Sequence, residues 1–275
     1  IFNGSASGIS TIATDTLESN QVNASFGCSV ASAGDINSDG YSDIIVGAAN
    51  VLSPQYTYGA AYIYYGSVVG ISPANSDTLS ISQVVASFGI SVSSGGDVNG
   101  DGYSDVIVGA YSYTNGQSQE GGVFIFNGSA SGIASIASDT LEINQASALF
   151  GGSVACAGDV NGDGFSDIIV GAASYSNPNP VEGGAFVFHG SAAGISNVPS
   201  FSIDGNIQNS RLGNSVAGAG DVNVDGYSDI IIGVKSYTTA NASEGKVLIY
   251  KGGPNGVITF GGVAIQTSPL QAQSQ

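Results

Sequence analysis

Short runs of β-branched and aromatic residues alternate with stretches of Gly, Ser, Asn and Asp along the whole chain. Runs such as residues 43–46 (DIIV), followed by Gly-Ala, are predicted to be buried strands. Runs such as residues 61–66 (AYIYYG) predict strands that end in a turn at Gly, and residues 28–34 (CSVASAG) predict an inner strand packed closely against its neighbours. A weaker fourth strand is predicted around the segments 15–21, 77–83 and 139–145. We expect no helix, because no amphipathic stretch of adequate length occurs.

This pattern repeats every 62 residues, without insertion or deletion. Four nine-residue strings, DINSDGYSD, DVNGDGYSD, DVNGDGFSD and DVNVDGYSD, begin at Asp35, Asp97, Asp159 and Asp221. A Phe-Gly pair precedes the string and a Gly-Ala pair follows it at fixed distances in the first three copies, and both pairs diverge in the fourth. Four short antiparallel strands in each unit are typical of the blades of a β-propeller.

The repeat also predicts the organisation of the chain. We expect a single array over residues 1–275, with repeats at 26–87, 88–149, 150–211 and 212–275. The sequence IFNGSASGI at Ile1 recurs at Ile125, so residues 1–25 are expected to be the trailing half of a preceding blade in a trimmed or processed chain. The divergent last repeat is expected to cap the array, and the tail from Ile258 to add an outer strand.

The ordered motifs Phe-Gly, DxNxDGxxD and Gly-Ala resemble the FG-GAP repeat, the unit of the integrin alpha-subunit β-propeller and of many bacterial surface proteins. The resemblance extends over essentially the whole chain. It implies an all-β, propeller-type array of four-stranded antiparallel blades, with a calcium loop joining the first two strands of each blade. The family usually closes a ring of seven blades, whereas this chain supplies little more than four. Either the chain is a fragment, or it forms something other than an ordinary seven-bladed ring.

The nine-residue strings have the composition of a calcium loop. Side-chain oxygens at positions 1, 3, 5 and 9 and a backbone carbonyl at position 7 make an all-oxygen set, which suits Ca²⁺ better than Zn²⁺ or Mg²⁺. Position 12 is apolar in every copy, which excludes an EF-hand. The alternative is a simple Asp-Asn-Gly turn, but crowded carboxylates repel one another without a cation. We therefore expect four structural Ca²⁺ ions, with these ligands: Asp35, Asn37, Asp39, Tyr41, Asp43, Asp97, Asn99, Asp101, Tyr103, Asp105, Asp159, Asn161, Asp163, Phe165, Asp167, Asp221, Asn223, Asp225, Tyr227 and Asp229.

The charge of the chain limits its partners. The net charge is −17, from 21 acidic and 4 basic residues, which argues against nucleic acid and against anionic membrane surfaces. No apolar run approaches the ~20 residues of a membrane span, so we expect no membrane insertion. The basic residues all lie in the last quarter of the chain, beginning at Arg211.

Few other residues indicate chemistry. The single histidine, His189, has no Ser-His-Asp set around it in the repeat, and more than half of the acidic residues belong to the loops, so we expect no enzyme. Cys28 and Cys156 stand at non-equivalent positions, and buried free thiols are expected rather than a disulfide framework. Candidate glycosylation sites, with Ser/Thr-linked sugar as an equal alternative, are Asn3, Asn23, Asn127 and Asn241.

These features predict an extracellular or cell-surface scaffold, stabilised by calcium, that mediates adhesion or self-assembly. Protein or glycan ligands are expected at the loops rich in Tyr, Asn and Ser that precede each third strand: residues 50–59, 111–122 and 173–184. An acidic N-terminal end, a basic C-terminal end and open sheet edges also allow head-to-tail association, which makes a filament if it does not close. The alternative is an accessory repeat array of a larger secreted enzyme.

Overall fold

The fold is known from a computed structural model, which describes residues 1–2, 4–51, 59–74, 76–238, 243–258 and 263–265. The regular elements assigned in these ranges are eighteen strands and no helix, as expected from the all-β sequence pattern. The described part of the chain contains no helix that is long and apolar enough to cross a membrane.

Sixteen of these strands form four antiparallel sheets of four strands, which we call blades 1 to 4. In each blade the strands are neighbours in chain order. Blade 1 contains β3 (Phe26–Gly34), β4 (Asp43–Ala48), β5 (Ala60–Tyr64) and β6 (Ser76–Leu79), and blade 2 contains β7 (Ser91–Gly96), β8 (Asp105–Ala110), β9 (Gly122–Phe126) and β10 (Asp139–Leu141). Blade 3 contains β11 (Phe150–Gly158), β12 (Asp167–Ala172), β13 (Gly184–Phe188) and β14 (Phe201–Asp204), and blade 4 contains β15 (Leu212–Gly220), β16 (Asp229–Val234), β17 (Lys246–Tyr250) and β18 (Val263–Ile265).

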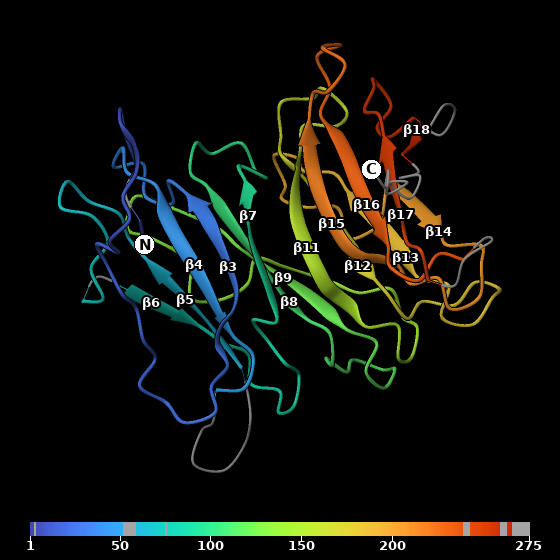
Figure 1. Cartoon of the computed structure of the whole chain (residues 1–275), viewed down its shortest axis with the longest axis horizontal. Coiled ribbons are helices and arrows are strands. Elements are labelled where there is room, and N and C mark those ends of the chain that lie inside the picture. Colours follow the sequence, from blue (N-terminus) through green and yellow to red (C-terminus); the bar gives the residue numbers. More distant parts are fainter. Residues whose placement is uncertain (3, 52–58, 75, 239–242, 259–262, 266–275) are drawn as a thin grey trace, which may run out of the picture.

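The blades follow one another across the molecule and form an open arc, in which blades 1 and 4 lie at opposite ends (Figure 1). The first strands of neighbouring blades, β3, β7, β11 and β15, contact one another in sequence. Before blade 1 lie a short hairpin of β1 (Gly4–Ser5) and β2 (Gly8–Ile9) and a segment without assigned strands, residues 10–25, that is tied to blade 1. One of these ties is the bond from the Asn50 N–H to the Ala24 carbonyl (3.1 Å).

The Phe-Gly and Gly-Ala motifs meet between blades. A Cβ atom added to Gly109, in the Gly-Ala pair of blade 2, would collide with the carbonyl oxygen of Gly151, in the Phe-Gly pair of blade 3. The same approach joins Gly47 to Gly89 and Gly171 to Gly213. Glycine is therefore required at these places because two backbones lie in contact.

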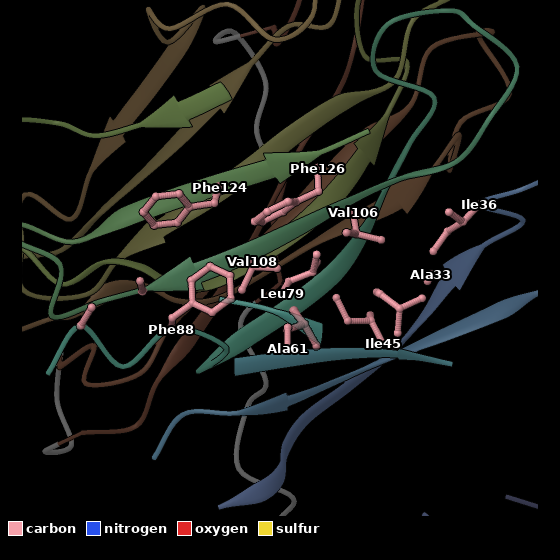
Figure 2. Close-up of a cluster of buried hydrophobic side chains, with 14 of the residues drawn as sticks. Ala33, Ile36, Ile45, Ala61, Leu79, Phe88, Val106, Val108, Phe124 and Phe126 are labelled. Carbon is pink, nitrogen blue, oxygen red and sulfur yellow. The ribbon is translucent and has the colours of Figure 1, made fainter. Parts of the chain in front are cut away.

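The hydrophobic core consists of layers between successive blades. Figure 2 shows one layer, a single cluster to which Ile45 and Ala61 of blade 1 and Val106, Val108 and Phe124 of blade 2 all belong. The second strands β8 and β12 are buried along their whole length, which explains why they read as continuous β-branched runs rather than as alternating ones.

The fourth strands agree only partly with the sequence prediction. β6 and β10 form within the segments 77–83 and 139–145, apart from the first residue of β6, but each is shorter than the segment. The strand predicted around residues 15–21 is wrong, since this segment has no assigned strand. One bond next to this segment matches blade 2: the Thr14 N–H donates to the Ile1 carbonyl (2.9 Å), as the Ser138 N–H does to the Ile125 carbonyl. In blade 2, β10 also pairs with Phe124 and Val123, whose counterparts in the repeat would stand before Ile1.

The outer strand expected from the C-terminal tail is confirmed as β18, which pairs with β17. Both cysteines are free thiols, but Cys28 is exposed rather than buried and Cys156 is half-buried. Burial raises the pKa of the Cys156 thiol.

Candidate calcium-binding loops

The four nine-residue strings form the loops between the first and second strands of the four blades. We call them loop 1 (residues 35–43), loop 2 (97–105), loop 3 (159–167) and loop 4 (221–229). Each loop begins directly after the first strand and ends on the first residue of the second strand. Because the blades repeat the same strand order, the four loops lie at the same end of their sheets.

The aspartate at position 1 lies at the centre of each loop. In loop 2, Asp97 Oδ1 accepts the N–H groups of Gly100 (2.7 Å) and Asp101 (3.1 Å), and Oδ2 accepts that of Gly102 (2.8 Å). The bonds from positions 5 and 6 recur in the other three loops. In loop 4, these backbone bonds hold the pKa of Asp221 below its usual value, and the bond from the Gly226 N–H has the largest effect.

Positions 3 and 5 bring further oxygens to the same place. Asn99 Nδ2 donates to Asp101 Oδ2 (3.0 Å), and Asn99 Oδ1 accepts the Asp101 N–H (3.0 Å). The remaining oxygen of Asp101 accepts the Tyr103 N–H (3.1 Å). Loop 4 differs, because Asn223 Oδ1 is buried and has no hydrogen-bond partner among the described residues. An oxygen in this condition has its lone pairs free for a cation.

The aspartate at position 9 has a structural role that the sequence did not reveal. Asp105 is fully buried, and its two oxygens accept the N–H groups of Val98 (2.9 Å) and Gly128 (3.0 Å). Equivalent pairs of bonds hold Asp43, Asp167 and Asp229. This carboxylate therefore ties its loop to the end of the third strand, although each oxygen keeps a second lone pair.

Burial also changes the acidity of position 9. It raises the pKa of Asp105 to about 6 and that of Asp167 to about 7, and nearby loop carboxylates add to the rise. The two backbone N–H bonds of each residue act in the opposite direction but do not compensate. A divalent cation in the loop would favour the ionised form of these carboxylates.

The residues of the loops fit a hard cation by the chemistry of their donors. No three His, Cys, Asp or Glu side chains converge as a metal site in the described ranges, so the fit depends on the mixed set of oxygens. Each loop supplies carboxylates at positions 1 and 5, an amide oxygen at position 3 and a backbone carbonyl at position 7, which are the ligand types that calcium prefers. Gly102 at position 6 has a φ of 88°, a conformation that favours glycine.

The other candidate residues lie apart from this set. His189 borders loop 3, with Nδ1 at 3.3 Å from Asn161 Nδ2, and burial lowers its pKa. Among the candidate glycosylation sites, Asn23 is exposed, whereas Asn127 is half-buried and accepts a hydrogen bond from Ser138 Oγ (2.8 Å). Asn3 and Asn241 lie outside the described residues.

The loops between the second and third strands lie at the opposite end of each sheet, as the antiparallel order requires. In blade 2 this loop is held by Glu120, which is fully buried and accepts the Asn115 N–H (2.5 Å) through Oε1. Gln83, from the preceding blade, makes two bonds of 2.7 Å with the backbone N–H and carbonyl of Thr114. Glu182 and Gln145 hold the loop of blade 3 in the same way. The 62-residue spacing of these Glu and Gln residues could have indicated their role.

Comparison with known proteins agrees with these features. The family model for the FG-GAP repeat matches residues 26–64, 88–126, 150–188 and 212–250. The chain belongs to the FG-GAP repeat family. Each match covers the first three strands of one blade and the loop between the first two.

Relatives of this FG-GAP array include integrin alpha subunits. It is 34% identical to integrin alpha-V of Gallus gallus over 223 residues, which are 78% of this chain and 20% of that protein. It is 36% identical to integrin alpha-5 of Xenopus laevis over 157 residues (54% of this chain and 14% of that protein) and 36% identical to integrin alpha-PS5 of Drosophila melanogaster over 154 residues (54% and 15%). The chain thus spans about a fifth or less of the length of these relatives.

Proposed function

We propose that this FG-GAP array is an extracellular, calcium-stabilised scaffold that mediates adhesion or self-assembly and carries out no catalysis. The observation that carries the proposal is the recurrence of one oxygen-rich loop, with the same residue types at the ligand positions, between the first two strands of four successive blades. The similarity to segments of integrin alpha subunits supports an extracellular, adhesive role.

Calcium accounts for the concentration of acidic residues in the loops. Three aspartates in each of the four loops account for 12 of the 21 acidic residues, and no lysine or arginine lies within a loop. One Ca²⁺ per loop would change the net charge from −17 to −9. Since a cation that binds only the folded chain stabilises it by mass action, calcium is expected to stabilise the array.

Adhesion would use the end of the blades opposite the calcium loops. The loops there are rich in Tyr, Asn and Ser, which suit contacts with protein or glycan. In blades 2 and 3 they are anchored by buried Glu120 and Glu182, so they can present their side chains with little loss of conformational entropy on binding.

Self-assembly would use the two ends of the arc. Val30 on β3 is 68% exposed, whereas its counterparts Val92, Val154 and Val216 are 5–6% exposed because a preceding blade covers them. Blade 4 and its flanks contain all four basic residues of the chain. An uncovered apolar strand at one end and basic residues at the other favour head-to-tail contact between copies, which gives a filament where it does not close.

Isothermal titration of CaCl₂ into the chelator-treated chain tests the calcium proposal. The expected result is uptake of one ion per loop, and Asp101→Asn is expected to remove the ion of loop 2. Glu18→Gln is the matched control, because it also removes one negative charge but lies exposed outside the loops. Absence of uptake, or an equal effect of the two substitutions, would contradict the proposal.

A further inference from the structure

Loops 1, 2 and 3 are each covered by the loop of the following blade. The serine at position 8 of the following loop donates its backbone N–H to the carbonyl of position 1. These bonds join Ser104 to Asp35 (3.1 Å), Ser166 to Asp97 (2.9 Å) and Ser228 to Asp159 (2.9 Å). The residue that opens each of the three loops is therefore held from a neighbouring blade.

In loops 2 and 3, the aromatic residue at position 7 of the following loop also covers position 4. A Cβ atom added to Gly100 would lie 2.6 Å from Cε1 of Phe165, and one added to Gly162 would lie 2.6 Å from Cε1 of Tyr227. In loop 1, Ser38 Oγ donates instead to the Gly102 carbonyl of loop 2 (2.9 Å). Position 2 is fully buried in these three loops, at Ile36, Val98 and Val160.

Loop 4 has the same donor types, but none of the described residues covers it in this way. Val222 at position 2 is 55% exposed, and Val224 at position 4 is 89% exposed. A Cβ atom added to Gly220 would meet no described atom within 4 Å, whereas one added to its counterpart Gly158 would collide with Ser228. Val224 also adopts a φ of 59°, a left-handed conformation that β-branched residues disfavour. Asn223 Oδ1 accepts no hydrogen bond from the described residues, whereas the equivalent amide oxygen in each of loops 1 to 3 accepts a backbone N–H.

We propose that loops 1 to 3 are each completed by the following blade, through the position 8 N–H in all three loops and the position 7 ring in loops 2 and 3, so that the affinity for calcium in these loops depends on residues of a neighbouring blade. This inference rests on the proposed calcium binding. The cover fixes the loop backbone before the cation arrives, which strengthens coordination by the oxygens. Calcium in a covered loop in turn stabilises the contact between the two blades.

Two matched substitutions test this inference. Tyr227→Ala removes the ring over loop 3, and Phe2→Ala removes an aromatic ring that is 57% exposed and lies outside the loops. Tyr227→Ala keeps the backbone carbonyl at position 7. In titration calorimetry, Tyr227→Ala is expected to weaken one site about tenfold or more relative to the wild-type chain, and Phe2→Ala to change none.

Stopped-flow release of calcium into a chelator gives an independent measurement. Tyr227→Ala is expected to speed the release of one ion about tenfold or more, and Asp163→Asn, which removes the ion of loop 3, to abolish that change. Thermal unfolding in chelator verifies that the variants fold, and Phe165→Leu provides a milder change over loop 2. Equal effects of Tyr227→Ala and Phe2→Ala would overturn this inference alone, whereas absence of any uptake would overturn the calcium proposal as well.

Discussion

The three aspartates of each loop have different surroundings at the residue scale. In loop 2, Asp97 accepts three backbone N–H groups of its own loop, Asp101 is exposed, and Asp105 is buried and bonded to Val98 and Gly128. The sequence predicted the donor types, because their spacing is regular. It could not predict the partners of position 9, since Gly128 lies 23 residues further along the chain and approaches only when the blade forms.

Asp105→Asn is expected to destabilise the chain even without calcium. The amide nitrogen cannot accept the N–H of Val98 or Gly128, so one buried donor loses its partner and the free energy of unfolding falls by about 1–3 kcal/mol. Urea denaturation in chelator measures this loss. Asp101→Asn is the control, because Asp101 is exposed, and its effect in chelator is expected to stay within about 0.5 kcal/mol. A loss of the same size in both variants would contradict the structural role of position 9.

At the scale of elements, the sequence predicted the inner strands more accurately than the outer ones. β8 and β12 are buried throughout, so their composition alone identifies them. The outer strands carry more exposed residues, and β10 keeps only three residues of its predicted segment. The sequence also could not predict why the Phe-Gly and Gly-Ala motifs require glycine, because the two glycines come into contact only when separate blades pack together.

Gly171→Ala is expected to weaken the packing of blade 3 on blade 4. Its Cβ atom would collide with the Gly213 carbonyl oxygen, and relief requires a movement of backbone that costs about 1–3 kcal/mol or more. Gly233→Ala is the matched control, because it is the same change at the equivalent place in blade 4, where the nearest atom lies 3.5 Å away. Urea denaturation of the full chain is expected to separate the two, and equal midpoints would refute the proposed contact between blades.

At the scale of the whole molecule, the repeat predicted four blades but not their arrangement. The blades form an open arc, so apolar positions at its ends remain uncovered, as at Val30. The low content of charged residues, 9%, and the net charge of −17 make cations the main means of reducing repulsion along the arc. Calcium and blade packing are therefore expected to act together in holding the array.

The most direct test of the calcium loops is an experimental structure of the chain determined in millimolar calcium. We expect density for one ion in each of the four loops, about 2.3–2.6 Å from oxygens of positions 1, 3, 5 and 7. Loops without such density, and with the hydrogen bonds of Asp97 and its counterparts unchanged, would contradict calcium binding by the loops.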